Sequence, residues 1–303
     1  MKRMHVDEVA IDAGLVSRLL AAQFPQWASL EISYVEPAGA EHAIYRLGEE
    51  MMARLPRTPR VAVQPAIDHC WLPKLAPLLP LRLPIPIALG EPGEDYPWPW
   101  SICAWIEGEP ATSERLADPT QTASDLAEFI GALQRVDLDP GPTPGPDNSW
   151  RGVPLAMRDE QTRASIDALA VVMDIAAVTA VWDEAVDAPE WKGPARWLHG
   201  DLDSRNLIAR GGRLHGVVDW GCLVMGDPAC DVMVAWKMLT GEAREQFRSE
   251  LSIDEATWSR ACGWAISQAV IALAYYTLET NAVLVMEARR WMAEVIDDRR
   301  TAG

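Results

Sequence analysis

The spacing of apolar residues changes along the chain, and this change limits the folds that are open to it. Up to about residue 106 the apolar residues form short, strand-like segments separated by glycine and proline. The segments are "LEISYVEPAG", "HAIYRLG", "EMMARLP", "IPIALGEP" and "WSICAWIEG", and the first three suggest an antiparallel meander. From Thr122 onward the spacing becomes helical. A small β-rich lobe followed by a larger, mainly helical lobe is an α+β pattern.

Helical spacing marks several segments of the chain. In the segment 122–136, Thr122 or Ser124 could supply the N-cap. A Pro/Gly-rich stretch over 139–149 must be a loop. Helices are expected over 6–23, 66–79, 122–136, 155–172 and 175–186, and from residue 228 to the end.

The charge balance restricts the partners of the chain. Among its 303 residues, 27 are Lys or Arg and 44 are Asp or Glu, which gives a formal net charge of −17. Nucleic acids and anionic membrane surfaces are poor partners for such a chain, whereas a cationic small molecule would be attracted to it. The alternative is that the acidity serves only solubility.

The cysteines and the apolar segments indicate the compartment. Five cysteines are scattered along the chain without a CxxC pair, so neither a disulfide framework nor a zinc site is expected. The first fifteen residues include acidic side chains where a signal peptide needs an apolar run. No apolar stretch reaches the roughly 18 residues expected of a membrane span. We therefore expect a cytoplasmic protein.

The stretch "RWLHGDLDSRNLI", residues 196–208, places polar side chains between two apolar flanks. A second apolar run, "LHGVVDWG", follows and contains Asp219. Magnesium prefers hard oxygen ligands, which Asn206 and Asp219 can supply, and Asp201 can accept a proton from a hydroxyl or orient it. His199 is interpreted as a packed support of the loop. The alternative for the whole set is a polar turn capped by its own Asp and Asn side chains.

Three motifs together carry a family resemblance. Three motifs, "HGDLDSRN", "GVVDWG" and "GDPACDV", occur along the chain in this order. Together they resemble the motifs of the aminoglycoside phosphotransferase family. Gly200 and Trp220 stand where protein kinases have the middle residues of H-R-D and D-F-G, which favours the small-molecule branch. The resemblance implies a bilobal protein-kinase-like fold. Residues 1–106 would form the small β-rich N-lobe that binds nucleotide, and residues 107–303 the mainly helical C-lobe with the catalytic loop and the acceptor site.

The resemblance assigns roles in the two polar motifs. Asp201 would be the catalytic aspartate, and Asn206 and Asp219 would be the ligands of Mg²⁺. Asp227 and Asp231 could brace the catalytic loop from a helix start, where carboxylates are favoured. Ordinary helix capping is the alternative for this last pair.

The nucleotide site departs from the general kinase pattern. The strand that usually offers a lysine offers Arg54, and the following helix offers Asp68 as its partner. Arginine keeps its charge and can grip phosphate with two donors, so it could replace lysine; a packing arginine is the alternative. Backbone amides around Gly39 would cradle the phosphates. The carbonyl of Ala104 and the N–H of Ile106 would hold adenine, unless these residues are only a core strand and turn.

The acceptor site is the least defined part. Asp203, two residues beyond Asp201, and Asp159 and Glu160 in "MRDEQTR" are candidates for binding the acceptor. For each of them a solvated helix face is the competing interpretation. Glu279 and Glu287 are further candidates for binding the acceptor, with the same competing interpretation.

The motifs predict a kinase that uses Mg²⁺ and moves the γ-phosphate of ATP or GTP to a hydroxyl of a small molecule. The leading acceptor is an aminoglycoside-like antibiotic, whose cationic charge would be attracted to the acidic chain. Phosphorylation of such an antibiotic would imply a role in antibiotic resistance. Other acceptors stay open, namely a macrolide, a peptide antibiotic, or a choline- or homoserine-like metabolite. A nucleotide-binding pseudokinase without turnover is a further alternative, and a monomer or weak homodimer is expected.

Overall fold

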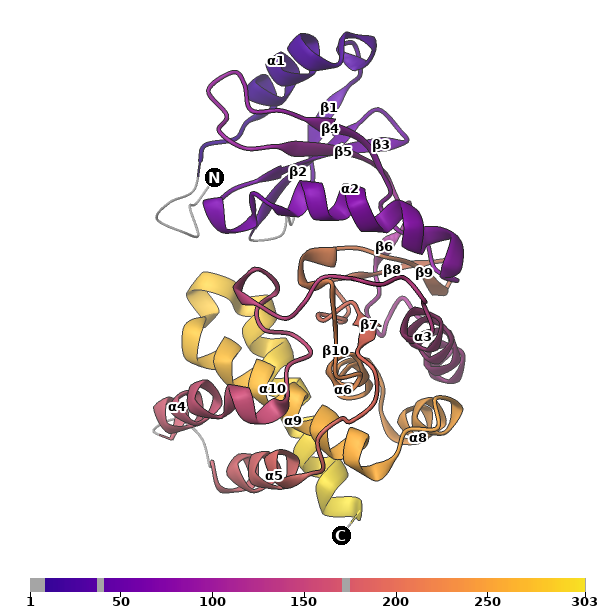
Figure 1. The fold of residues 1–303 in the computed structure, drawn as a ribbon, viewed down its shortest axis with the longest axis vertical. Helices are drawn as coiled ribbons and strands as arrows, with labels where there is room; N and C mark the ends of the chain where they lie inside the picture. The colour runs from indigo at the N-terminus through magenta and orange to yellow at the C-terminus, as the bar shows by residue number, and fades with distance from the viewer. Residues whose placement is uncertain (1–8, 37–40, 171–174, 303) are drawn as a thin grey trace. The chain divides into compact units, whose positions relative to one another are not determined.

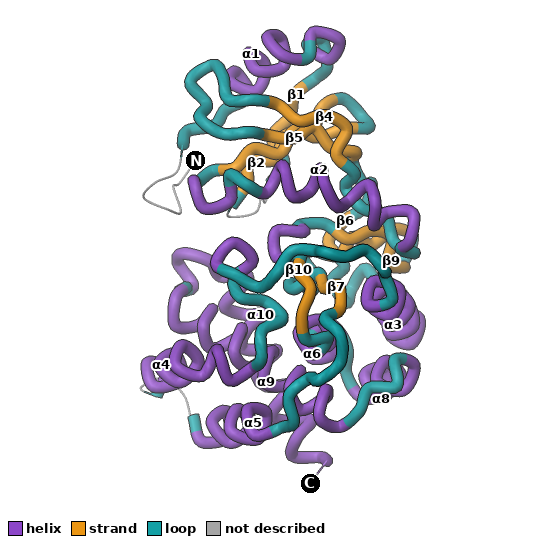
Figure 2. Tube along the Cα trace, in the orientation of Figure 1, coloured by secondary structure: helices purple, strands orange, loops and turns teal. Residues whose placement is uncertain are grey.

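The chain folds into two compact units. The computed structural model describes residues 9–36, 41–170 and 175–302. The first unit comprises Met1–Gly108 and a later segment, Gly216–Gly221. The second comprises Glu109–His215 and Cys222–Gly303. Strands dominate the first unit and helices the second (Figure 2), as the predicted α+β class requires.

The first unit is built on a five-stranded antiparallel sheet with the order β1-β2-β3-β5-β4. The predicted meander over its first three strands is confirmed. Tyr45 pairs with Ala53, which pairs with Ile102, so these side chains share one face of the sheet. The strands are β1 Ile32–Tyr34, β2 His42–Leu47, β3 Met51–Pro56, β4 Pro86–Gly90 and β5 Trp100–Ala104.

Two helices accompany this sheet (Figure 1). Helix α1, Ala13–Gln23, begins later than its apolar spacing suggested, because the Asp12 carboxylate accepts the Leu15 N–H at 2.7 Å and caps it. Its apolar face joins the buried core formed with Tyr45 and Trp100. Helix α2, Gln64–Leu75, carries Asp68 and continues for only two residues beyond Pro73.

The second unit is arranged around one long helix. Helix α9, Glu255–Tyr275, is buried almost continuously from Thr257 to Val270. The other helices are α3 Pro119–Gln134, α4 Asp159–Leu169, α5 Ala176–Asp187, α6 Ala229–Val232, α7 Val234–Met238, α8 Gly241–Glu250 and α10 Leu278–Ala302, of which α4, α5, α6, α7 and α10 pack on α9 (Figure 1).

One detail of the helical prediction was wrong. Helix α3 starts three residues before Thr122, and its N-cap is Asp118 rather than Thr122 or Ser124. The Asp118 carboxylate accepts the N–H of Thr120 at 2.9 Å, and Pro119 occupies the first turn, where its missing N–H costs nothing. Among the described residues, no helix combines the length and apolarity needed to cross a membrane.

Short strands hold the loops of the second unit. They are β6 Glu109–Pro110, β7 Arg196–Leu198, β8 Leu207–Arg210, β9 Arg213–Val217, whose last two residues are counted with the first unit, and β10 Val224–Gly226. Strand β7 pairs with β10, and β8 pairs with β6 and β9. The 199–206 loop, which connects β7 to β8, is therefore fixed at both ends by sheet pairing.

Candidate active site

The 199–206 loop is tied to the start of helix α6 by Asp231. The fully buried Asp231 carboxylate accepts the backbone N–H groups of His199 and Gly200, both at 2.7 Å. Gly200 has φ +82°, and a Cβ there would lie 2.7 Å from the Cys222 carbonyl oxygen, so only glycine fits. The expected bracing role of Asp231 is thus present in the structure.

Asp227 makes a second attachment at the same place. Its carboxylate accepts two bonds from the Arg260 guanidinium, at 2.7 and 3.2 Å, and both side chains are buried. It also accepts the Ala229 N–H at the start of α6. Asp227 therefore joins α6 to α9, and it supports the 199–206 loop only indirectly.

Asp201 lies between cationic groups. Its side chain is 28% exposed, and its Oδ1 lies 3.5 Å from Arg151 Nη2 and 3.9 Å from Lys237 Nζ. Burial alone would raise the pKa of Asp201, but the charges of Lys237, Arg151 and Arg205 outweigh it and lower the pKa to about 2. The carboxylate is therefore ionised at neutral pH and can accept a hydrogen bond from a hydroxyl.

Asn206 folds back on Asp201. Its Nδ2 donates to the Asp201 backbone carbonyl at 2.8 Å and to the Asp201 Oδ2 at 3.3 Å. Because the amide nitrogen is engaged in this way, the Oδ1 of Asn206 is the atom that remains for a metal ion.

A second polar cluster lies in the first unit. Arg54, which is 8% exposed, donates from Nη1 to Asp68 at 2.5 Å and from Nη2 to Asp219 at 2.9 Å. Burial alone would lower the pKa of Arg54, but the two carboxylates outweigh it and raise the pKa, so the positive charge is permanent. Gln64 donates to Asp68 at 2.7 Å and to the Trp220 carbonyl at 3.2 Å. Asp68 is thus fixed between two donors.

Asp219 is held in an unusual backbone conformation. It has φ +58°, in the left-handed region that L-residues with a side chain rarely adopt. Aspartate tolerates this region better than most residues, and such strain is concentrated at functional sites. Its side chain is 48% exposed while it accepts from Arg54, so one carboxylate is both oriented and accessible.

Comparison with known proteins identifies the family. The model of the "Phosphotransferase enzyme family" matches residues 35–264, which is most of the chain. The chain belongs to this phosphotransferase family. A comparison with curated proteins found no match.

Solved phosphotransferase structures share the fold. The GDP and kanamycin complex of APH(2")-IIia has a TM-score of 0.71 at 16% identity, covering 92% of this chain and 98% of that chain. The streptomycin–ATP complex of APH(2")-IIa has a TM-score of 0.59 at 19% identity, covering 95% and 99%. The macrolide 2'-phosphotransferase MphH from Brachybacterium faecium has a TM-score of 0.60 at 20% identity, covering 93% and 98%. The expected protein-kinase-like fold is confirmed.

The other residues predicted to contact the nucleotide of this phosphotransferase belong to the first unit. Gly39 lies outside the described residues. Ala104 ends β5 and donates its backbone N–H to the Ile85 carbonyl at 2.9 Å. Ile106 is 8% exposed and packs on Gly216, where an added Cβ would lie 2.8 Å from its Cγ2. The assignment of the last two to adenine binding stays a prediction.

The structure places the three acidic acceptor candidates in different surroundings. Asp203 is fully buried, and its carboxylate accepts from the backbone and guanidinium of Arg205. Asp159 begins α4 and accepts from Arg163 and from the Trp182 indole, each at 2.8 Å. Glu160 is exposed, and the side chain of Asp159 is 38% exposed. The carboxylate of Asp203 is thus a support of its own loop.

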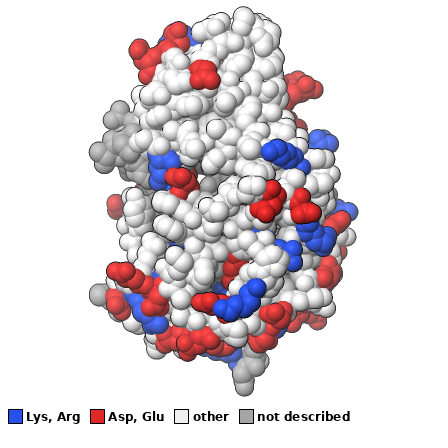
Figure 3. All heavy atoms as spheres, viewed as in Figure 1, with Lys and Arg blue, Asp and Glu red and all other residues white. Residues whose placement is uncertain are grey.

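The acidity of the chain lies elsewhere. On the face drawn in Figure 3, acidic side chains gather mainly over the helices of the second unit. Around Asp201, by contrast, the charged neighbours include Arg151, Lys237 and Arg205. The net charge of −17 therefore says little about the immediate surroundings of Asp201.

Two of these neighbours, Arg151 and Lys237, were missed by reasoning from sequence. Lys237 lies in the apolar run "VMVAWKML", and its side chain is fully buried. Lysine is almost never fully buried unless it is paired, so a single cation in such a run was the available signal. Arg151 follows the Pro/Gly-rich loop, where the apolar residues have no regular spacing from which the direction of a side chain could be predicted.

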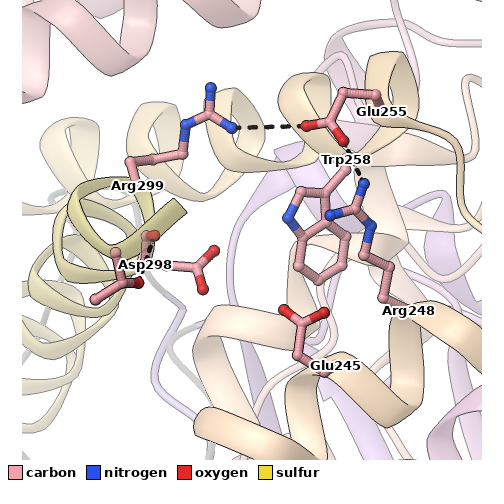
Figure 4. Close-up of a pocket in the computed structure, with 7 residues that line it drawn as sticks. Glu245, Arg248, Glu255, Trp258, Asp298 and Arg299 are labelled. Atoms are coloured by element: carbon pink, nitrogen blue, oxygen red, sulfur yellow. Dashed lines mark hydrogen bonds and ion pairs between the residues drawn. The ribbon is translucent and has the colours of Figure 1, made fainter. Parts of the chain in front are cut away.

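A small hollow occurs in the second unit outside these clusters. It has a volume of about 190 Å³ and is lined by Glu245, Arg248, Glu255, Trp258, Asp298, Arg299 and Thr301 (Figure 4). Arg248 and Arg299 both pair with Glu255, at 2.5 and 3.9 Å. None of the lining residues is a predicted site residue, and the hollow is edged by ordinary surface ion pairs.

Proposed function

We propose that the protein transfers the γ-phosphate of a nucleoside triphosphate to a hydroxyl group of a small molecule. The observation that carries this proposal is the geometry of the 199–206 loop. Its Asp201 carboxylate is ionised, and Asn206 is folded against it. Asp231 fixes the backbone just before Asp201, at the end of β7. Phosphoryl transfer needs such positioning and charge, and little covalent participation from the protein.

Three side chains would bind the nucleotide and its metal ion. Arg54 would bind phosphate oxygens with its guanidinium. Asp219, an oriented and accessible carboxylate, and the amide oxygen of Asn206 suit the hard-oxygen preference of Mg²⁺, and they would hold it. When bound, the ion would neutralise charge on the phosphate oxygens.

Asp201 would act on the acceptor. Its carboxylate would accept a hydrogen bond from the hydroxyl and orient the oxygen in line with the γ-phosphorus. The new O–P bond forms as the bond from phosphorus to the β,γ-bridging oxygen breaks. The nucleoside diphosphate leaves, and the hydroxyl proton passes to Asp201 and then to solvent.

Two acceptor classes are supported by different observations. The kanamycin and streptomycin complexes among the structural neighbours, together with the net charge of −17, support an aminoglycoside-like antibiotic as acceptor, which would make the protein a resistance enzyme. A second class, compounds with an apolar body such as macrolides, is favoured by large apolar side chains that the second unit exposes. These are Trp150, Met157, Tyr275, Leu278, Val283 and Met286, each between 45% and 66% exposed.

The test is a nucleotide-consumption assay with ATP and GTP, with and without Mg²⁺. The acceptor panel contains aminoglycosides, macrolides, a peptide antibiotic, choline and homoserine, and mass spectrometry detects the phosphorylated product. We expect one class to be phosphorylated in a Mg²⁺-dependent way. Nucleotide binding without product from any acceptor would instead favour a pseudokinase.

Salt separates the two acceptor classes. Attraction between exposed charges is screened over about 8 Å at physiological ionic strength. Added salt should therefore lower kcat/KM steeply for a polycationic acceptor and leave it nearly unchanged for an acceptor bound through apolar contacts. A flat salt response with a cationic substrate would argue against the acidic exterior as its recruiting surface.

A further inference from the structure

Lys237 is a buried cation directed at Asp201. The side chain is fully buried on α7, and its Nζ donates to the Gln268 Oε1 of α9 at 2.6 Å. The same Nζ lies 4.4 Å from the centre of the Trp291 ring of α10 and 3.9 Å from the Asp201 Oδ1. Three helices thus converge to hold one ammonium group next to one carboxylate.

A lysine in this position is not explained by stability alone. Burial lowers the pKa of Lys237, and the carboxylates of Asp201 and Asp203 oppose this effect. An apolar side chain of the same length would generally be accommodated at least as well in a packed core. Because Gln268 and the Trp291 ring offer no negative charge, the ammonium group is compensated by carboxylates, first by Asp201 at 3.9 Å and second by Asp203.

Arg151 approaches the same oxygen from another part of the chain. Its Nη2 lies 3.5 Å from the Asp201 Oδ1, and its side chain is 13% exposed. The loop that carries it includes Ser149, Trp150 and Gly152 with φ +55°, +57° and +71°. Left-handed conformations at Ser149 and Trp150 are costly, and such strain persists where a functional geometry requires it.

We propose that Lys237 and Arg151 are positioning residues that hold the Asp201 carboxylate by its Oδ1. With Oδ1 held in this way, Oδ2, which accepts a 3.3 Å bond from Asn206, keeps a lone pair for the acceptor hydroxyl. The proposal rests on the proposed function, because it assigns the geometry of Asp201 to two cations outside the 199–206 loop. Neither cation needs to touch nucleotide or acceptor.

The pairing can be measured without any activity. Urea unfolding of the full chain would compare wild type, Lys237→Met, Asp201→Asn and the double variant. Methionine keeps the length of the side chain without its charge. Removing one partner leaves a buried charge uncompensated, whereas removing both does not. We expect the shift in unfolding midpoint of the double variant to be clearly smaller than the summed shifts of the single variants.

The positioning role is measured by kinetics. Lys237→Met and Arg151→Met should each lower kcat by about 10²-fold, the effect of misplacing a reacting group by about 1 Å, while nucleotide Kd and acceptor KM change little. Arg244→Met is the matched control. Arg244 is a 4% exposed cation of the second unit that binds Glu294 and Asp298, so its loss should lower stability without a comparable loss of kcat.

The outcomes separate the two proposals. Two results would overturn the positioning role: additive unfolding shifts, or a kcat of Lys237→Met no lower than that of Arg244→Met. In either case, turnover by the wild type would still support the proposed function. If wild type phosphorylates no acceptor, the proposed function fails and the positioning role fails with it. Non-additive shifts together with a selective loss of kcat would support both.

Discussion

Arg54 donates to the Asp219 carboxylate at 2.9 Å, although the two residues are 165 positions apart in the chain. The same guanidinium binds Asp68, so an arginine stands between a buried carboxylate and an accessible one. A single positive charge thereby orients the carboxylate proposed to hold Mg²⁺. This arrangement makes the substitution of Arg54 informative in two ways.

Arg54→Ala should both destabilise the protein and weaken nucleotide binding. The 2% exposed Asp68 would lose its counter-charge, which costs about 3–5 kcal/mol when a buried pair is broken. Arg54→Lys keeps the charge but not the two-pronged geometry, so it should retain most stability while raising the nucleotide KM by about tenfold, which corresponds to roughly 1.4 kcal/mol.

Arg60→Ala is the control for that pair of variants. Arg60 pairs with Glu41 at the surface of the same unit, where both side chains are more than a third exposed. Surface pairs contribute about 0–1 kcal/mol. Thermal melts beside kinetics distinguish the cases, and a nucleotide KM that is unchanged in Arg54→Lys and Arg54→Ala would leave Arg54 with a packing role only.

Replacing the two proposed metal ligands should have different consequences. Asp219→Asn keeps a residue that tolerates positive φ and removes the charge, so it should weaken nucleotide binding in Mg²⁺ and leave the Mg²⁺-free affinity nearly intact. Asn206→Ala also removes the bond to the Asp201 carbonyl, so it should lower kcat as well. Calorimetric titrations with and without Mg²⁺ measure the difference, and equal Mg²⁺ dependence in wild type and Asp219→Asn would refute the assignment.

Asp201→Ala should lower turnover by about 10²–10⁴-fold while nucleotide affinity stays largely intact, because the group acts mainly in the transition state. Single-turnover measurements at saturating nucleotide test this directly. Turnover within a few-fold of wild type would remove Asp201 from the reaction.

Asp231→Ala should unfold more easily than any surface variant. Two buried backbone N–H groups, those of His199 and Gly200, would lose a charged acceptor at 2.7 Å, and each unsatisfied donor costs about 1–3 kcal/mol. Chemical denaturation gives the loss directly. Hydrogen exchange should also show faster exchange at the amides of these two residues, and unchanged exchange there would contradict the bracing role.

The N-cap of α9 gives a pH-dependent prediction. The Asp254 carboxylate accepts the Thr257 N–H at 2.7 Å, and this bond lowers the pKa of Asp254 below 3.8. A lowered folded-state pKa contributes stability that is present above the unfolded value and is lost as pH falls through the folded value. Asp254→Ala should therefore cost about 1 kcal/mol at pH 7 and progressively less below about pH 3.8. A cost that does not change with pH would exclude the charged cap.

The sequence predicted the parts of the structure that depend on local pattern. Alternating apolar residues bounded by glycine and proline located the meander, and contiguous motifs located Asp201, Asn206 and Asp219. The structure gives the hydrogen-bond and ion-pair partners of these three residues, and their roles in the reaction stay predictions. The family comparison confirms the kinase-like fold that the motifs implied.

Features that depend on tertiary packing were not predictable in this way. Nothing local indicates that Lys237 meets Asp201, because three helices must first assemble around it. The position of Arg151 depends on neighbouring residues in the left-handed conformation, and no sequence periodicity indicates them. Asp203 was expected to face an acceptor because of its proximity to Asp201 in sequence, yet its side chain turns inward to Arg205. Proximity in sequence does not fix the direction of a side chain in a loop.

The segment 216–221 has a consequence for how the protein is made on the ribosome. The first unit needs it, because Val217 donates to the Arg82 carbonyl, Gln64 to the Trp220 carbonyl and Arg54 to Asp219. These contacts cannot form until residue 221 has emerged, long after residue 108. At about 5–20 residues per second, the nascent sheet waits on the order of ten seconds, during which Arg54 and Gln64 lack their partners in this segment. Translation therefore cannot complete the two units one after the other, and the first remains open to chaperones until much of the second has been synthesised.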